Sequence, residues 1–148
     1  MIAIGCDHGG FTLKTAIIEH LKERGIDFKD FGCYNGDAVN YPDVAEVVCE
    51  SVISGQSRLA ILCCGSGIGM SMAANKVKGI RAAACSETFS AEFTRRQNDA
   101  NVLCLGGRVI GPAVANQMVD LFIDTEFEGG RHQTRVDMIT AIENKNCK

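Results

Sequence analysis

Residues 59–71 read LAILCCGSGIGMS, a short apolar run followed by a glycine-rich turn that leads into a helical pattern. Glycines in the turn allow backbone N–H groups to converge at a helix N-terminus, where the helix dipole favours negative charge. Cys64 lies at the lip of this turn, where the same field stabilises a thiolate, and the hydroxyl of Ser66 is two residues away. The stretch predicts a strand, an anion-binding turn and a helix in succession. The alternative is a β–α turn that carries a structural, buried cysteine.

This turn does not match the common nucleotide- and phosphate-binding loops. The dinucleotide-binding fingerprint requires a third glycine where Met70 stands, and a phosphatase-type loop requires an arginine at the same position. The nucleophile elbow requires a glycine where Cys64 stands, and the Gly-Lys-Ser/Thr of a Walker loop is missing. The function of the turn therefore has to be inferred from the rest of the chain.

Length and composition indicate one domain over residues 1–148. The formal net charge of −3 favours neither nucleic acid nor an anionic membrane as a partner. The apolar runs are too short to span a membrane and the N-terminus lacks a signal-peptide pattern, so we expect a cytoplasmic protein. The eight cysteines include no Cys-x-x-Cys pair, and we expect reduced thiols rather than disulfides or zinc ligands.

Five apolar runs of β type alternate with segments of helical period. The runs span residues 2–6, 26–31, 59–63, 80–85 and 102–105. Continuous apolar strands joined by helices are typical of a parallel sheet that is covered on both faces. We therefore predict an α/β fold, a three-layer α/β/α sandwich around a five-stranded parallel sheet, with an extra helix at the C-terminus.

Polar residues follow several of these runs, at the carboxyl ends where parallel α/β sheets bind ligands. They are Asp7 and His8 after the first run, the Cys64 turn after the third, Ser86 and Glu87 after the fourth, and Arg108 after the fifth. Asp7 could instead cap a helix or close an Asx-turn, and His8 could be a solvated loop residue. We interpret Ser86 and Glu87 as residues that serve the N-terminus of a helix.

A second polar concentration, GGRHQTR, spans residues 129–135 before the last helix. Arg131 and Arg135 are four residues apart and share one helix face. Two guanidinium groups on one face repel each other unless an anion lies between them, and arginine suits phosphate oxygens. The alternative is a structural role, with ion pairs to Asp124, Glu126 or Glu128.

Taken together, these motifs resemble the sugar-phosphate isomerases that comprise type B ribose-5-phosphate isomerase and the related galactose-6-phosphate and allose-6-phosphate isomerases. The matching motifs cover nearly the whole chain: residues 5–10 (GCDHGG), 41–43 (YPD), 64–71 (CGSGIGMS), 73–76 (AANK), 98–101 (NDAN), 106–108 (GGR) and 129–135. The resemblance implies a flavodoxin-like or Rossmann-like sheet and a homodimer or dimer of dimers with active sites at the subunit interface. It also implies a sugar-phosphate substrate, no cofactor and no metal.

By resemblance, Cys64 is the base that moves a proton between C1 and C2 of the sugar, and Ser66 assists at the enediol oxygens. Asp7 and His8 correspond to residues that contact the sugar and the ring oxygen. The other substrate-binding positions that the family implies are Tyr41 as a pocket wall, the turn residues Gly65, Gly67, Ile68 and Gly69, Asn98, His132, and the phosphate-binding Arg108, Arg131 and Arg135.

The chain departs from the family at Gln97, where the ribose-phosphate isomerases usually carry a histidine credited with ring opening. Glutamine does not titrate near neutral pH, so it cannot replace a general acid. Either His132 or Asp7 takes over this step, the substrate is presented differently, or the ring opens in solution. Ribose 5-phosphate is the expected substrate. The alternatives are a six-carbon sugar phosphate, a binding protein with weak turnover, and a phosphocysteine carrier.

Overall fold

The computed structural model describes residues 1–146 and contains one five-stranded sheet in which every pairing is parallel. The strands are β1 (Ile2–Cys6), β2 (Phe28–Asp30), β3 (Leu59–Cys64), β4 (Ala82–Ala84) and β5 (Val102–Gly106). All five predicted runs are confirmed as strands. β2 and β4 are shorter than predicted because they are the edge strands of the order β2-β1-β3-β5-β4, and each is paired on one side only.

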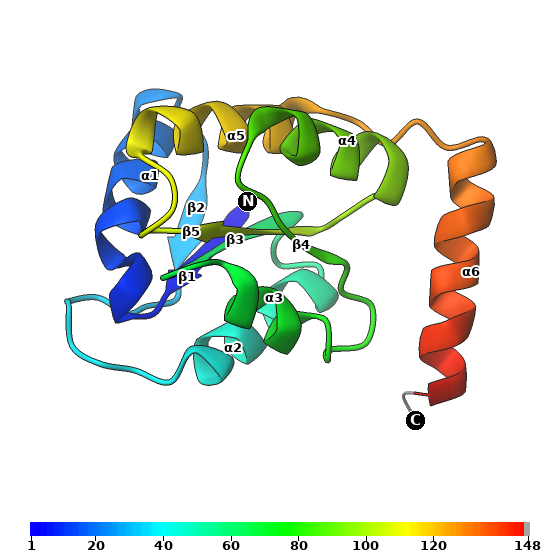
Figure 1. Ribbon diagram of the computed structural model, residues 1–148, viewed down its shortest axis with the longest axis horizontal. Helices are drawn as coiled ribbons and strands as arrows, with labels where there is room; N and C mark the ends of the chain where they lie inside the picture. The colour runs from blue at the N-terminus through cyan, green and yellow to red at the C-terminus, as the bar shows by residue number, and fades with distance from the viewer. Residues whose placement is uncertain (147–148) are drawn as a thin grey trace.

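All the helices except the last form the two outer layers (Figure 1). The helices are the 3-10 turn η1 (His8–Gly10) and the α-helices α1 (Phe11–Glu23), α2 (Tyr41–Ile53), α3 (Ile68–Ala74), α4 (Thr88–Asn98), α5 (Pro112–Asp124) and α6 (Arg131–Asn146). α1, α4 and α5 cover one face of the sheet, and α2 and α3 cover the other. The predicted three-layer sandwich is confirmed, and α6 is the additional C-terminal helix.

The helices begin where the sequence supplies starting signals. Pro42 and Pro112 lie in the first turns of α2 and α5, where a missing N–H group costs no hydrogen bond. The carboxylate of Glu87 accepts a hydrogen bond from the backbone N–H of Ser90 and so caps α4. The prediction that Glu87 serves the N-terminus of a helix is confirmed.

The core consists of two apolar layers, one on each face of the sheet. Neighbouring residues of β3 contribute to different layers, because successive side chains of a strand point to opposite faces. Cys63 packs with α1 and α5, whereas Cys64 packs with α2 and α3. Only one of these two adjacent thiols therefore faces the layer that contains α3.

The strand order decides which turns meet. The chain passes from β1 outward to β2 and then returns to the other side of β1 to form β3, so β1 and β3 border the switch point at which open α/β sheets bind ligands. β5, rather than β4, lies next to β3. The turn after β5 therefore meets the turn after β3.

Within the described range, no helix has the length and apolar character that crossing a membrane would require. Cys147 lies outside the described residues, so the expectation of a reduced thiol there is not addressed by the structure. Every cysteine inside that range is a free thiol.

Candidate active site

A hollow of about 420 Å³ opens at the carboxyl ends of β1, β3 and β5. Its lining residues are Asp7, Tyr41, Cys64, Gly65, Ser66, Gly69, Arg108 and Val109. The turns after three different strands and the first residue of α2 thus contribute to one small space. The prediction that functional groups gather at this edge of the sheet is confirmed for Asp7, Cys64 and Arg108.

Cys64 is the last residue of β3, and its side chain lies at the start of the glycine-rich turn. The backbone N–H of Gly67 donates a hydrogen bond to Cys64 Sγ at 3.1 Å. Gly67 has a φ of +82°, in the left-handed region that glycine adopts without strain. The N–H dipole of Gly67 therefore points toward the sulfur and fixes the position of the thiol at the mouth of the turn.

Cys63 has a different environment although it is the adjacent residue. It is fully buried on the other face of the sheet, and burial raises the pKa of its thiol. A thiol in these surroundings stays protonated and has no access to a ligand in the hollow. The structure therefore separates the two thiols into a structural one and one that lines the hollow.

Ser66 and Tyr41 complete the wall around the thiol. Ser66 Oγ accepts a hydrogen bond from the backbone N–H of Ile68 at 3.2 Å, and the residue is exposed. The ring of Tyr41 packs against Gly69, since a Cβ added at Gly69 would lie 2.9 Å from Tyr41 Cζ. The absence of a side chain at Gly69 lets the aromatic ring approach the turn.

Asp7 belongs both to the hollow and to a local turn. Its Oδ1 atom accepts hydrogen bonds from the backbone N–H groups of Gly9 and Gly10, at 2.9 and 3.2 Å. The helix-capping alternative for Asp7 is therefore confirmed, while the same carboxylate lines the hollow. His8 is exposed and is not among the lining residues, so its contact with the sugar stays a prediction.

Arg108 reaches the hollow because the turns after β3 and β5 are hydrogen-bonded to each other. The N–H of Gly107 donates to the carbonyl of Cys64 at 2.8 Å, and the N–H of Arg108 donates to the carbonyl of Gly65 at 3.0 Å. No carboxylate within residues 1–146 lies at ion-pair distance from the Arg108 guanidinium. This cation is therefore available to an anionic ligand.

Several predicted site residues lie elsewhere in the chain. Gln97 and Asn98 end α4, and the carbonyl of Asn98 accepts a hydrogen bond from Arg81, which directly precedes β4, at the amino end of that strand. Arg131, His132 and Arg135 open α6, which stands apart from the sheet on the opposite side of the molecule from the turn after β5 (Figure 1). The fold of one chain does not bring these residues to the hollow.

The structural alternative for the two arginines of α6 is wrong for the described residues. Asp124 pairs with Arg24 at 3.1 Å, and neither Arg131 nor Arg135 forms an ion pair within the described part of the chain. Both arginines are exposed, whereas His132 between them is buried. The two guanidinium groups on this face remain without a protein anion.

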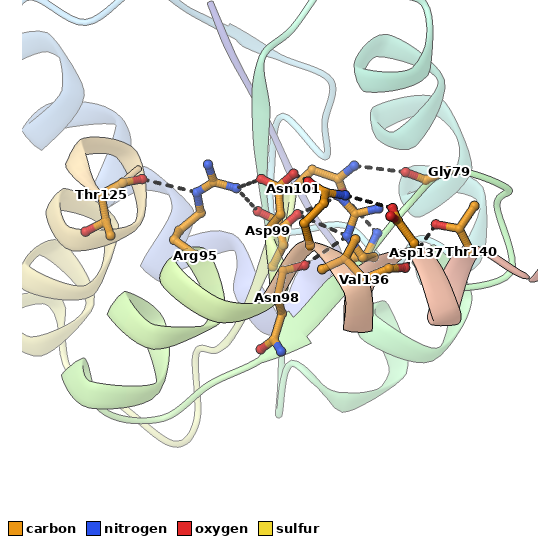
Figure 2. A network of polar contacts seen from close by, with 12 residues as sticks. Gly79, Arg95, Asn98, Asp99, Asn101, Thr125, Val136, Asp137 and Thr140 are labelled. Carbon is orange, nitrogen blue, oxygen red and sulfur yellow. Dashed lines mark hydrogen bonds and ion pairs between the residues drawn. The ribbon is translucent and has the colours of Figure 1, made fainter. Parts of the chain in front are cut away.

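The NDAN motif at residues 98–101 holds the end of α4 (Figure 2). Asp99 adopts a left-handed φ of 47°, and its carboxylate forms an ion pair with Arg95 at 2.8 Å. Arg81 donates to the carbonyl of Asp99, also at 2.8 Å, and Asn101 accepts a hydrogen bond from the backbone N–H of Arg81. The sequence interpretation missed the two arginines of this network, although the spacing of Arg95 and Asp99 is that of a helical ion pair.

No group of three or more His, Cys, Asp or Glu side chains is placed to hold a metal ion in the part of the chain that the structure describes. The hollow instead offers a thiol, a hydroxyl, a carboxylate and a guanidinium. At the switch point of a parallel sheet, this set defines an α/β protein with a site for a small anionic molecule and with a candidate base.

Comparison with known proteins narrows this class. The model of a family described as Ribose/Galactose Isomerase matches residues 2–139, and the chain belongs to that family. It is 49% identical to ribose-5-phosphate isomerase B of Escherichia coli strain K12 over 144 residues, which cover 97% of each protein.

Solved structures agree with this assignment. The fold is similar to that of ribose-5-phosphate isomerase B from Clostridium thermocellum, with a TM-score of 0.95 and 49% identity over 97% of both chains. It is also similar to ribose-5-phosphate isomerase B from Mycoplasma genitalium, solved with bound ribulose 5-phosphate, with a TM-score of 0.93 and 43% identity over 98% of this chain and 97% of that one.

Proposed function

We propose that this chain, as one domain over residues 1–148, is an aldose–ketose isomerase that interconverts ribose 5-phosphate and ribulose 5-phosphate without a cofactor. The observation that carries the proposal is the position of Cys64 Sγ, which accepts the N–H of Gly67 inside a hollow that Asp7, Ser66 and Arg108 also line. The relatives with the same fold are named for this reaction.

The reaction requires a base for the proton next to the carbonyl and donors for the enediolate oxygens. Cys64 removes the proton from one carbon and returns it to its neighbour. The N–H groups of Gly67 and Ile68 are already occupied by Cys64 Sγ and Ser66 Oγ. The remaining N–H groups of the turn, those of Gly65, Ser66 and Gly69, are the proposed oxyanion donors.

Binding of the sugar phosphate rests on charge and shape. Arg108 contacts the anion, Asp7 contacts a sugar hydroxyl or the ring oxygen, and Tyr41 forms the wall of the hollow. A volume of about 420 Å³ is within the range of small-molecule sites. Arg108, which has no ion pair among the described residues, supplies the positive charge that faces the phosphate.

A second copy of the chain completes the site in this proposal. Gln97, Asn98, Arg131, His132 and Arg135 are implied by the family but lie away from the hollow. α6 contacts α4 and leaves a groove of about 500 Å³ against the edge of the sheet. Its apolar residues Met138, Ile139 and Ile142 are 62%, 46% and 64% exposed, which is typical of a helix that packs against another subunit. We therefore propose a homodimer, or a dimer of dimers, with shared sites.

Shared sites can be tested by mixing two impaired variants. Cys64→Ala and Arg131→Ala proteins are denatured together, refolded and assayed at a substrate concentration far below KM, where loss of a phosphate contact lowers the rate of Arg131→Ala in proportion to its raised KM. If the site combines Cys64 of one subunit with Arg131 of the other, half of the mixed dimers' sites are intact, and activity returns to about a quarter of the native value on statistical mixing. If each subunit holds a complete site, no activity returns.

The function itself is tested by incubating the protein with five- and six-carbon aldose phosphates and measuring the ketose formed. Ribose 5-phosphate should give the highest kcat/KM, and Cys64→Ala should abolish turnover while retaining binding of the sugar phosphate. Binding without turnover by the native protein would instead indicate a binding protein. Stable covalent phosphate on Cys64 would indicate a phosphocysteine carrier.

A six-carbon sugar phosphate is the second candidate, and Gln97 is the observation that favours it. Its amide hydrogen-bonds a hydroxyl group but does not transfer a proton near neutral pH. Gln97 lines a separate hollow of about 270 Å³ beside Phe89 and Phe93. A higher kcat/KM for allose 6-phosphate or galactose 6-phosphate would support this candidate.

The proposed location is the cytoplasm, because the described cysteines are free thiols.

A further inference from the structure

Two buried thiols that the proposed mechanism does not use lie in contact with each other at the end of β1. Cys6 ends β1, and Cys33 follows β2. Their sulfur atoms are 3.7 Å apart. The backbone N–H of Cys33 donates to the carbonyl of Cys6 at 2.7 Å, which holds the segment after β2 against the end of β1.

This contact places the two sulfur atoms next to each other without any intervening side chain or backbone group. The sulfur atoms already face each other, so a bond between them requires a closer approach but no rearrangement of the fold. Among the described residues, no other pair of cysteine sulfurs is in hydrogen-bonding contact.

The two thiols differ in their access to solvent. Cys33 is followed by an exposed loop over residues 34–38, and its Sγ donates to the carbonyl of Asn35 at 3.1 Å. Cys6 is fully buried, and burial raises its pKa to about 12 despite the opposing effect of the Lys14 ammonium. Cys33 is therefore the thiol that a small oxidant reaches first, and Cys6 is the partner already in place.

We propose that Cys6 and Cys33 form a reversible disulfide when the protein meets hydrogen peroxide. The Cys33 sulfur attacks one peroxide oxygen, the O–O bond breaks, and the second oxygen leaves as water after taking up a proton, so that a sulfenic acid remains on Cys33. The Cys6 sulfur then attacks Cys33 Sγ, the S–O bond breaks, and a second water leaves. Two thiols and one peroxide thus become one disulfide and two waters.

The bond acts on the site through Asp7, which follows Cys6 directly and lines the hollow. Bond formation shortens the sulfur separation from 3.7 Å to about 2.05 Å. This contraction draws the end of β1 toward the segment after β2 and displaces Asp7 from its place in the wall. Misplacement of a binding group by about 1 Å lowers turnover by as much as 10²-fold, and we expect a loss on the order of tenfold in kcat/KM.

The experiment begins with the reduced protein and a small molar excess of hydrogen peroxide. Remaining thiols are alkylated, and the digest is examined by mass spectrometry. A peptide pair that links Cys6 to Cys33 and disappears after treatment with dithiothreitol supports the proposal. A digest in which both residues stay alkylated, or in which Cys6 is linked to another cysteine, overturns it.

Variants separate this pair from the other thiols. Cys63→Ala is the matched control, because Cys63 lies in register with Cys6 on β3 and packs in the same core layer. The link should persist in Cys63→Ala and be absent in Cys33→Ala. Cys33→Ala should also lose the dithiothreitol-reversible part of the inactivation by peroxide. Equal, reversible inactivation of Cys33→Ala would assign the loss of activity to another thiol such as Cys64.

The activity measurement rests on the proposed isomerase function, whereas the peptide map does not. If the native protein shows no isomerase activity, the map still decides whether the disulfide forms. If the disulfide forms and kcat/KM is unchanged, the proposed displacement of Asp7 is wrong and the bond has no regulatory role. Failure of one proposal is therefore distinguishable from failure of the other.

Discussion

Gly69→Ala should lower the activity of the site without lowering the stability of the fold. A Cβ at this position would lie 2.9 Å from Tyr41 Cζ, 3.0 Å from Cε2 and 3.3 Å from Cε1. Ordinary carbon contacts are about 3.5–4.0 Å, so the ring has to withdraw by roughly 0.6–1 Å. Tyr41 is 39% exposed and has room to move outward.

The structure predicts opposite signs for stability and activity. Gly69 has no positive φ and lies in the first turn of α3, where alanine is favoured over glycine by at most about 1 kcal/mol. The melting temperature should therefore be unchanged or slightly higher. Displacement of the Tyr41 ring should lower kcat/KM about tenfold, which corresponds to about 1.4 kcal/mol of transition-state stabilisation.

The assay is steady-state isomerisation of ribose 5-phosphate together with thermal unfolding of the same samples. Gly69→Ala in a Tyr41→Ala background is the control, because the added methyl group then meets no ring. The second substitution should have no further effect there. Native kcat/KM in the Gly69→Ala single variant, or independent losses in the double variant, would refute a role for Tyr41 as the wall of the site.

Four further predictions follow from particular side chains. Cys64→Ala should abolish turnover with a normal melting temperature, whereas Cys63→Ala should lower the melting temperature more than kcat; the reverse pattern would exchange the two roles. Arg108→Ala should raise KM about ten- to a hundredfold through loss of charge-assisted hydrogen bonds worth about 1.5–3 kcal/mol, and equal activity on ribose and ribose 5-phosphate would contradict an anion site. Gln97→His should raise kcat on ribose 5-phosphate and add a titrating group to the pH–rate profile if ring opening limits the native enzyme; an unchanged or lower kcat would make Gln97 a specificity contact. Hydrogen bonds from Ser90 lower the pKa of Glu87, so its contribution to stability is present above the unfolded pKa and is lost as pH falls through the folded pKa. Glu87→Gln should therefore reduce the loss of unfolding free energy at acid pH. An unchanged acid dependence of the unfolding free energy would exclude this cap as its source.

Local pattern was sufficient to predict the strands and layers. The three central strands are unbroken apolar runs, because they are buried on both faces, and such runs are recognised without knowledge of their partners. The two edge strands were overestimated in length, because the apolar pattern extends beyond the residues that find a hydrogen-bonding neighbour. The position of Cys64 relative to Cys63 also followed from local geometry, since side chains alternate along any strand.

The candidate site was predictable in part for the same reason. Asp7, Cys64 and Arg108 each follow a strand, and the carboxyl ends of parallel strands share one edge of the sheet. Tyr41 was assigned through resemblance, since nothing in the local pattern around residue 41 indicates a contact with Gly69. Gln97 and the arginines of α6 entered in the same way, and one folded chain does not bring them to the hollow.

By itself, the sequence determined the fold class, the glycine-rich turn and the chemistry of the groups at the strand ends, because each depends on residues that are close in the chain. Only the tertiary structure decided that β5 lies beside β3, so that Arg108 hydrogen-bonds to the turn at Cys64. It also decided the contact of Cys6 with Cys33 and the joint hold of Arg81 and Arg95 on Asp99. The physical reason is that strand order and long-range contacts are set by how whole faces pack against each other, a property that no short stretch of sequence encodes.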